Sequence, residues 1–350
     1  MASETISNKL DRLGRQGYPQ SASVEVTARC NAQCEYCYLK DVSFKELSTQ
    51  ELCAAILKLS DNGVYHLHCT GGEPFLRPDI LTVLSFAMEN GILACTLFTN
   101  GTLLSQEHLD FLTQHKDFFR TVQMSVFSHD PMINDSYFGV KGALETVVKN
   151  ALFLQENGLR AIIALTICDF NLETMEETRR FLESRGLSVA LAYFKTVTGP
   201  RLRRVLAQSN TYDFFKRYLL NLRPEEIERD KQRMKESLAK PPQLDAEMCF
   251  GRWNAVFMNA QGDLAPCISF RNVNLGNVLE ERSLRDILQQ APDYHSICSI
   301  RKRDMKKCVQ CKFYNFCIIC LGNIHTENNS LCGLDDQMCN YAQALFDLTY

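Results

Sequence analysis

The chain has 350 residues, of which 45% are hydrophobic and 23% charged, a composition that excludes a disordered or fibrous protein. Its length allows one large domain with a smaller attachment. The formal net charge of -3 gives no overall basic field, so we expect no nucleic acid partner held through its phosphates. The N-terminus has no secretory signal, and no stretch is apolar for long enough to cross a membrane, so we expect a cytoplasmic protein with no membrane partner.

Residues 20–199 alternate short β-rich segments with amphipathic helical patterns, and the first of these helical patterns starts with a capping box, Ser48 and Glu51. Repeated alternation of this kind predicts an α/β fold with a parallel sheet and right-handed crossovers, either an open doubly wound sheet or a full or partial barrel. The expected strands are Ser21–Thr27, Tyr65–Thr70, Ile92–Phe98, Thr121–Val126, Arg160–Ile167 and Ser188–Phe194, and the expected helices are Ser48–Asp61, Asp79–Asn90, Ser105–His115, Lys141–Glu156 and Asn171–Ser184.

Composition changes after this alternating region. Gly199-Pro200 ends the pattern, and residues 200–246 are polar and mostly helical, which is typical of a connector. Residues 247–350 are richer in cysteine and show little periodicity, as expected of a region that metal binding orders. We therefore expect an N-terminal extension at 1–19, a core at 20–199, the connector, and a cysteine-rich domain at 247–350. Sixteen cysteines in a chain without a signal peptide favour metal binding over disulfides.

Three cysteines follow the first expected strand directly, where barrels and doubly wound sheets place their ligand-binding loops: Cys30, Cys34 and Cys37. Three thiolates on one short loop can hold three irons of a [4Fe–4S] cluster and leave the fourth iron open, whereas a closed zinc site needs a fourth ligand. For this triplet alone, a zinc site and unrelated core cysteines remain the alternatives.

The spacing Cys30-x3-Cys34-x2-Cys37, with Tyr36 before the last cysteine, resembles the motif of radical S-adenosylmethionine (SAM) enzymes. The resemblance continues through Gly71-Gly72-Glu73-Pro74 after the second strand, Thr99-Asn100-Gly101 after the third, and Ser125 on the fourth. Because these segments occur together and in strand order, they favour an iron–sulfur cluster over zinc.

This resemblance implies a partial (β/α)6 barrel in which the open iron chelates the methionine part of SAM. An electron from the cluster would then split SAM to give a 5′-deoxyadenosyl radical. The glycine pair would let the backbone approach the ligand, Glu73 would accept hydrogen bonds from the SAM ammonium, and Tyr36 would pack beside the adenine. The implied cofactor-binding residues are Tyr36, Gly71, Gly72, Glu73, Pro74, Asn100 and Ser125.

One position departs from the family pattern. Many relatives have a basic residue about twelve positions after the serine of the fourth strand, where it pairs with the SAM carboxylate, but this chain has Tyr137 there. The partner of that carboxylate stays open, and Lys141 and Arg160 are the candidates.

The C-terminal region contains further spaced cysteines, and paired Cys-x2-Cys groups such as these also occur in zinc ribbons. Their order resembles the SPASM extension of enzymes that mature peptides and sulfatases. The resemblance implies a first auxiliary [4Fe–4S] cluster on Cys249, Cys267 and Cys320, and a second on Cys308, Cys311, Cys317 and Cys339.

Some ligands of these auxiliary clusters are undecided. The first set lacks an evident fourth ligand, which leaves either an open iron or a recruited residue such as Cys298. Cys332 competes with Cys339 for the last position of the second set. We expect the remaining cysteines to be small apolar core residues: Cys53, Cys69, Cys95 and Cys168.

The function implied by the resemblance is that of an oxidoreductase that modifies a side chain or backbone carbon of a peptide or protein, for example by forming a cross-link in a ribosomally made peptide. The expected partners are this substrate, a low-potential electron donor of the flavodoxin or ferredoxin type, and a separate peptide-recognition protein. Formylglycine formation is less favoured, because Ile268 follows Cys267 where that group has an aspartate. The alternatives are an enzyme that modifies a small molecule or tetrapyrrole, and a zinc-binding interaction module.

Overall fold

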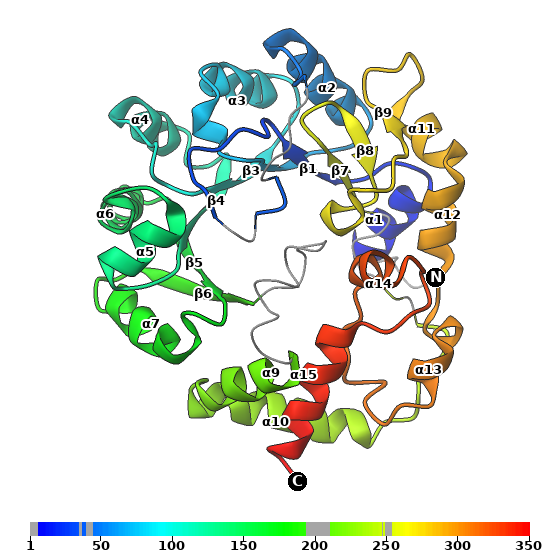
Figure 1. Cartoon of the computed structure of the whole chain (residues 1–350). Helices are drawn as coiled ribbons and strands as arrows, with labels where there is room; N and C mark the ends of the chain where they lie inside the picture. The colour runs from blue at the N-terminus through cyan, green and yellow to red at the C-terminus, as the bar shows by residue number, and fades with distance from the viewer. Residues whose placement is uncertain (1–5, 35–36, 40–44, 194–210, 247, 249–253) are drawn as a thin grey trace.

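A single nine-stranded sheet forms the centre of the molecule, with the order β6-β5-β4-β3-β2-β1-β7-β8-β9 (Figure 1). The structure, a computed structural model of the chain, describes residues 6–34, 37–39, 45–193, 211–246, 248 and 254–350. The first six strands pair in parallel with their neighbours in chain order. They are β1 (Ser21–Glu25), β2 (His66–Thr70), β3 (Ala94–Thr99), β4 (Phe119–Val126), β5 (Ala161–Ile167) and β6 (Ser188–Tyr193). The expected α/β fold with a partial (β/α)6 barrel is thus confirmed.

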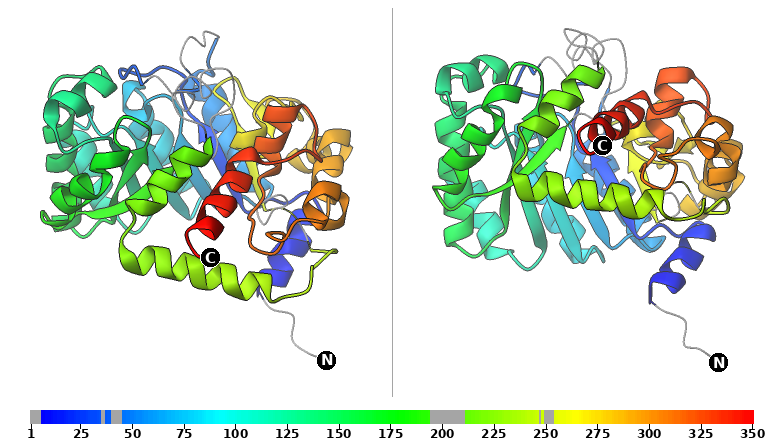
Figure 2. Two further views of the ribbon diagram at one scale, coloured as in Figure 1. Left: turned by 60° about the horizontal axis from the view of Figure 1, so that its bottom comes forward. Right: turned by 90° about the horizontal axis from the view of Figure 1, so that it is seen from below.

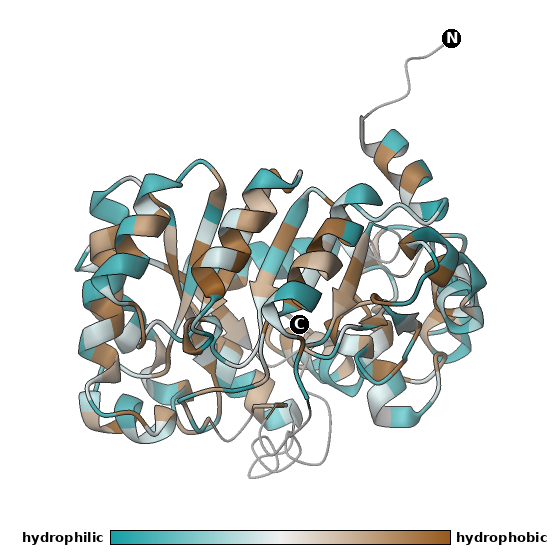
Figure 3. Cartoon of the chain, turned by 90° about the horizontal axis from the view of Figure 1, so that it is seen from above, coloured by the Kyte–Doolittle hydropathy of each residue, from teal (hydrophilic) through white to brown (hydrophobic). Residues whose placement is uncertain are grey.

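Helices follow the strands and cover the outer face of the sheet, and Figure 3 shows apolar colour on the strands between them. The predicted capping box of Ser48 and Glu51 is present at the start of α2. One helix, α5, was not expected from the sequence, because it is short and starts from an Asp130-Pro131 cap rather than a long apolar stripe. The elements are α2 (Thr49–Asp61), η1 (Pro74–Leu76), α3 (Ile80–Glu89), α4 (Gln106–Gln114), α5 (Pro131–Phe138), α6 (Ala143–Glu156), η2 (Leu172–Thr174) and α7 (Met175–Glu183).

The two faces of the barrel strands differ in polarity. Residues that point outward, such as Val24, Leu67, Leu97 and Met124, are buried in the main hydrophobic core beneath the helices. The alternate residues point to the barrel interior, are half-buried and are mostly polar. They include Ser21, Ser23, His66, His68, Thr70, Thr96, Gln123, Ser125 and Thr166.

The C-terminal region continues the same sheet. Strand β7 (Ala255–Met258) pairs in parallel with β1, and β8 (Asp263–Ala265) and β9 (Gly276–Asn277) add antiparallel strands, drawn in yellow beside β1 in Figure 1. The cysteine-rich region therefore attaches at the strand that leads into the three-cysteine loop.

The C-terminal region contains more helices than its sequence indicated. These helices are short, so they leave only a weak periodic pattern in the sequence. An N-terminal helix, α1, lies in the expected extension and contacts α11 through the hydrogen bond from Gln289 to the Arg15 carbonyl. No helix among the described residues is long and apolar enough to cross a membrane. The elements are α1 (Ile6–Arg15), α9 (Thr211–Leu220), α10 (Pro224–Leu238), η3 (Ile268–Phe270), α11 (Leu284–Gln290), α12 (Pro292–Ser299), η4 (Lys302–Asp304), α13 (Lys306–Val309), α14 (Leu321–Asn328) and α15 (Asp336–Asp347).

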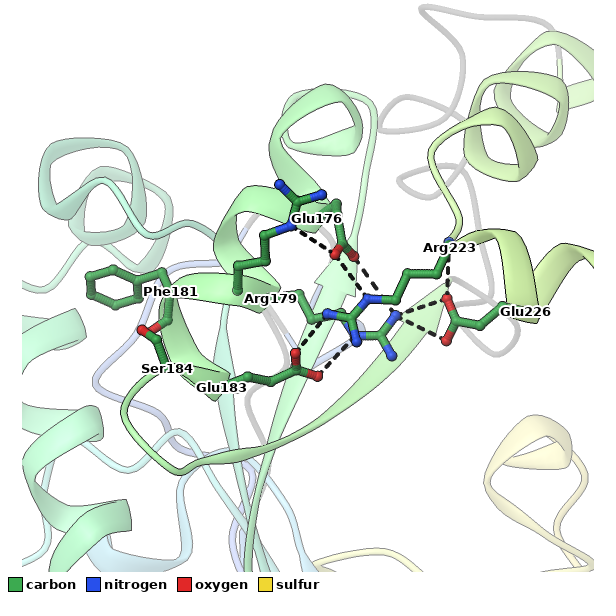
Figure 4. A network of polar contacts seen from close by, with 8 residues as sticks. Glu176, Arg179, Phe181, Glu183, Ser184, Arg223 and Glu226 are labelled. Atoms are coloured by element: carbon green, nitrogen blue, oxygen red, sulfur yellow. Dashed lines mark hydrogen bonds and ion pairs between the residues drawn. The ribbon is translucent and has the colours of Figure 1, made fainter.

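Helix α10 ties the far side of the barrel to the C-terminal helix. At its start, Arg223 pairs with Glu183 and Glu176 of α7 at 2.6 and 2.9 Å, and Arg179 pairs with Glu226 at 2.8 Å (Figure 4). Partly buried ion pairs that share partners in a network stabilise a fold more than isolated surface pairs do. Figure 2 shows α10 passing α15 on its way to the C-terminal region, and the Tyr341 hydroxyl of α15 donates a hydrogen bond to Asp230 of α10.

Candidate functional site

The three-cysteine loop leaves β1 at the carboxyl edge of the parallel strands. The Cys37 N–H donates to the Cys34 carbonyl at 3.1 Å, which places these two residues in one turn. Cys30 is exposed, while Cys34 and Cys37 are half-buried. Desolvation raises the pKa of the Cys30 thiol, and the nearby Glu73 and Cys37 raise it further. The structure thus gathers the three predicted thiols in one loop, and Tyr36 lies outside the described residues.

The base of this loop is fixed by a carboxylate. Glu46 accepts hydrogen bonds from the Thr27 hydroxyl at 2.9 Å and from the Ala28 N–H at 2.8 Å, and it pairs with Arg29 at 3.4 Å. The buried Arg77 donates to the carbonyls at positions 26 and 47 and so joins the end of β1 to the segment before α2. The sequence analysis did not single out Glu46 or Arg77, because both bind backbone or loop atoms that are distant along the chain.

The glycine pair packs against the same loop. A Cβ at Gly71 would lie 2.2 Å from the Thr27 carbonyl oxygen, and one at Gly72 would lie 2.1 Å from the Arg29 carbonyl oxygen. The Gly72 and Glu73 N–H groups donate to those two carbonyls at 2.8 Å. Any larger residue would push the three-cysteine loop away, so loop packing alone requires glycine at both positions. The sequence led us to expect glycine here because the backbone would approach a ligand; the structure gives packing on the loop as the reason.

Glu73 connects the loops after β2 and β3. Its side chain is fully buried, and its carboxylate accepts hydrogen bonds from the Thr99 hydroxyl at 2.7 Å, the Phe75 N–H at 3.1 Å and the Asn100 N–H at 2.6 Å. Burial raises the pKa of Glu73, while these three bonds lower it. Pro74 begins η1 and is buried beside it.

Asn100 then reaches the cysteine loop. Its side-chain amide donates to the Asn31 side chain at 2.8 Å and to the Cys30 sulfur at 3.7 Å. Cys30, Glu73 and Asn100 are therefore joined by hydrogen bonds at one place. Ser125 lies on β4, the strand next to β3. It is half-buried on the inner face and pairs with Ala164 of β5.

The position where relatives have a basic residue serves apolar packing here. The Tyr137 ring stacks on Phe170 with centroids 4.2 Å apart and lies 4.6 Å from Phe127, and Cys34 packs against the same cluster. Lys141 and Arg160 are both exposed, and Arg160 precedes β5, at the strand edge opposite the loop. The geometry therefore disfavours Arg160 as the partner of a ligand in this site.

A buried trio that the sequence analysis missed links this loop to the C-terminal region. Glu25 is 0% exposed, and its Oε1 accepts a hydrogen bond from the Tyr38 hydroxyl at 2.8 Å. The Arg271 guanidinium lies 4.0 Å from the Tyr38 ring centroid. Burial raises the pKa of Glu25, and the charge of Arg271 and a backbone hydrogen bond with Ala260 lower it. Arg271 follows η3, which starts directly after Cys267.

Four C-terminal thiols surround one cavity of about 400 Å³: Cys308, Cys311, Cys317 and Cys339. These are the four cysteines that the resemblance assigned to the second auxiliary cluster, whereas Cys332 is exposed and does not line the cavity. A zinc ion would need its thiolates within about 2.3 Å, whereas a multi-iron cluster spans a larger space, and the four thiols share the wall of a cavity that offers such space. No three His, Cys, Asp or Glu side chains in the described part of the chain are arranged around a single ion.

The environment of this cavity is apolar. Phe313, Tyr314, Ile319 and Met338 share its wall with the thiols. Burial raises the pKa of Cys339 to about 12 and that of Cys317 further, and negative groups nearby add to both effects. Thiolates become stable here when a cation binds them, so the residues present fit an iron–sulfur cluster.

The proposed ligands of the first auxiliary cluster lie on packed segments. A Cβ at Gly322, two residues after Cys320, would lie 2.3 Å from the Ser269 side chain, two residues after Cys267. Cys249 lies outside the described residues. Cys298 is fully buried in the main core, whereas Cys267 packs in a separate cluster of the C-terminal region, so the structure gives no support to Cys298 as a fourth ligand.

The four cysteines expected in the core are found there. Cys69, Cys95 and Cys168 are buried, and Cys53 is half-buried against the main core. Burial raises the pKa of Cys95 and of Cys168 to about 12, which makes both thiols unreactive. The expectation of structural roles is confirmed.

Comparisons with known proteins match the two cysteine regions separately. The family model of the radical SAM superfamily matches residues 24–182, and that of the SPASM iron–sulfur cluster-binding domain matches residues 249–312. AlbA of Bacillus subtilis, an antilisterial bacteriocin subtilosin biosynthesis protein, is 24% identical over 307 residues, or 85% of this chain and 66% of AlbA. An AdoMet-dependent heme synthase of Oleidesulfovibrio alaskensis is 26% identical over 341 residues, or 91% of this chain and 86% of the synthase.

Among solved structures, SuiB of Streptococcus suis has a similar fold. Its crystal structures with S-adenosylmethionine and with the precursor peptide SuiA both superpose with a TM-score of 0.71, at 22% and 21% sequence identity. Each superposition covers 94% of this chain, and 79% and 78% of SuiB.

Proposed function

The chain belongs to the radical SAM superfamily and carries a SPASM iron–sulfur domain, and from this premise we propose that it oxidises a peptide by radical chemistry. Its cofactors are S-adenosylmethionine and [4Fe–4S] clusters. When bound together, a cluster and SAM supply a one-electron cleavage that yields a 5′-deoxyadenosyl radical able to remove a hydrogen atom from the substrate.

In this proposal the loop with Cys30, Cys34 and Cys37 holds the SAM-cleaving cluster. Glu46 and the glycine pair fix the base of that loop, and Glu73 fixes Asn100 beside Cys30. Tyr36, Gly71, Gly72, Glu73, Pro74, Asn100 and Ser125 bind SAM. Positioning of this kind is the protein's contribution, because the cofactors carry out the bond cleavage.

The C-terminal cysteines hold two auxiliary clusters, the first on Cys249, Cys267 and Cys320 and the second on the four thiols of the cavity. When bound there, such clusters would supply an acceptor for the electron that oxidation of the substrate releases, as the formation of a cross-link requires. A low-potential donor of the flavodoxin or ferredoxin type supplies the first electron, and a separate recognition protein delivers the peptide.

The polarity of the barrel interior is the observation that carries the choice of a peptide. The described inner-face residues are mostly serine, threonine, glutamine and histidine, which suit the hydrogen-bonding groups of a peptide better than the apolar macrocycle of a tetrapyrrole. AlbA and SuiB, with its precursor peptide, support the same choice. A tetrapyrrole is the second candidate, because the heme synthase aligns with 91% of this chain.

Deuterium transfer tests the substrate class directly. Anaerobically reconstituted enzyme would be given SAM, dithionite and either a deuterated short peptide encoded beside its gene or iron coproporphyrin III. We expect deuterium from the peptide in 5′-deoxyadenosine, and no product with the Cys30/Cys34/Cys37→Ala variant. Substrate-dependent turnover of the porphyrin alone would replace the peptide proposal with the second candidate.

A further inference from the structure

A buried carboxylate, that of Asp335, lies between the two proposed auxiliary-cluster sites. Its side chain is 4% exposed and stands directly before α15. It lines the four-thiol cavity and also a small second cavity beside Cys320. Neither the resemblance nor the motif spacing assigned a role to this residue, because it is no cysteine and lies in a loop.

The hydrogen bonds of Asp335 connect one proposed ligand of each cluster. Its Oδ2 accepts from the Cys320 N–H at 3.1 Å, and its Oδ1 accepts from the Met338 N–H at 3.1 Å, which caps α15. Its own carbonyl accepts from the Cys339 N–H at 2.9 Å. Cys320 and Cys339 are therefore attached to the same residue, although they are assigned to different clusters.

The charge of Asp335 also reaches both sets of thiols. Asp335 shares the wall of the cavity with Cys308, Cys317 and Cys339, and it accepts a hydrogen bond from the Cys320 N–H of the other set. Apolar groups such as Met338 surround it, so this charge is weakly screened. Because reduction adds negative charge to a cluster, a nearby carboxylate disfavours the reduced state.

On the premise of the proposed auxiliary clusters, we infer that Asp335 is a positioning residue shared by both, which fixes Cys320 relative to Cys339 and keeps both reduction potentials low. A role as a helix cap alone would be served equally well by asparagine. Asparagine retains one acceptor for the Met338 N–H but loses the charge and the acceptor for the Cys320 N–H. The Asp335→Asn variant therefore separates the two roles.

The test uses the Cys30/Cys34/Cys37→Ala chain, so that iron content and electron paramagnetic resonance report the auxiliary clusters alone. Asp335→Asn and Asp335→Ala would be compared with Asp336→Asn, which removes the same charge from an exposed neighbour. We expect Asp335→Asn to keep the cavity cluster at a raised midpoint potential and to lose iron from, or change the spectrum of, the cluster held by Cys320. Asp335→Ala should lose iron from both.

Two results would overturn the inference: Asp335→Asn that matches the parent in iron content, spectrum and potentials, or Asp336→Asn that shifts the potentials as much. Complete iron loss in Asp335→Asn would also overturn it, because the inference expects the cavity cluster to remain in that variant. If the parent triple-alanine chain itself binds no iron, the proposed auxiliary clusters fail instead, and the two failures are thus distinguishable.

Discussion

The three-cysteine loop and the four-thiol cavity hold their cysteines through different kinds of contact. The loop is fixed by polar contacts: the Ala28 N–H donates to Glu46, the Asn100 side chain donates to the Cys30 sulfur, and the Asn100 N–H donates to Glu73. Its Cys30 is exposed. The cavity is lined mainly by aromatic and aliphatic side chains; its Cys308 is 8% exposed, whereas its Cys311 is exposed. A polar, accessible loop suits an iron that exchanges ligands with a charged cofactor, whereas an apolar enclosure suits a cluster with a complete set of protein ligands.

The largest expected effect concerns the three-cysteine loop. Changing Cys34→Ala should reduce SAM cleavage to the background level while leaving roughly eight irons per chain on the auxiliary clusters. Production of 5′-deoxyadenosine and iron content measure the two quantities. Cys53→Ala, which alters a half-buried core cysteine, is the control and should retain cleavage. Equal loss of iron from both regions would show that the sites do not load separately.

The second largest effect concerns iron binding in the four-thiol cavity. Cys317→Ser should lose roughly four irons per chain and lower the melting temperature, because metal binding and folding of this region are coupled. The exposed Cys332→Ser, which lies off the cavity, is the matched control and should bind as much iron as the unaltered chain. Iron loss in Cys332→Ser instead would move the last ligand from Cys339 to Cys332.

Glu73→Gln tests the three-cysteine loop without removing a cysteine, because it weakens the hydrogen bonds that hold Asn100 beside the loop. The amide places a donor where the carboxylate accepted from Asn100 or Thr99, and an unmatched buried polar group costs about 1–3 kcal/mol. Unfolding by denaturant should show that loss, and SAM should bind more weakly. The exposed Glu89→Gln at the end of α3 should change neither quantity. Unaltered SAM affinity would mean that Asn100 needs no such support.

Tyr38→Phe tests the link between the two regions. It removes the hydroxyl that donates to Glu25 and should lower the free energy of unfolding by about 1–3 kcal/mol. Because Tyr38 also contacts Arg271, a double-mutant cycle of Tyr38→Phe with Arg271→Ala should give a coupling energy. Additive losses in thermal or denaturant unfolding would show that the trio does not act as a unit.

The last expected effect depends on pH and comes from the barrel interior. Burial, with the neighbouring His66, lowers the pKa of His68 from 6.5 to about 4. Between these values the unfolded chain binds a proton that the folded chain does not, so stability should fall as the pH decreases from 6.5 toward 4. His68→Asn should flatten this part of the curve of unfolding free energy against pH. An unchanged curve would assign the acid sensitivity to other groups.

Local patterns predicted the barrel and the first loop well, because strand alternation and the Cys30–Cys37 spacing are encoded within short segments. The contacts that complete the sites were not predictable in this way. Arg271 reaches Tyr38, and Asp335 reaches Cys320, only after the chain has folded, and no spacing rule relates such pairs. The SAM-binding role of the glycine pair stays a prediction, and its packing on Thr27 and Arg29 needed the structure.

The parallel pairing of β7 with β1 has a consequence for synthesis on the ribosome. Residues 21–24 pair with residues 255–258, so one edge of β1 stays unpaired until most of the chain has emerged. An open strand edge is prone to wrong pairing, and a nascent chain is exposed to that hazard for longest at its first strand. This strand leads into the Cys30 loop, so iron delivered before β7 is synthesised would encounter a cluster site whose supporting sheet is incomplete. Slow translation would lengthen that period and favour aggregation over assembly.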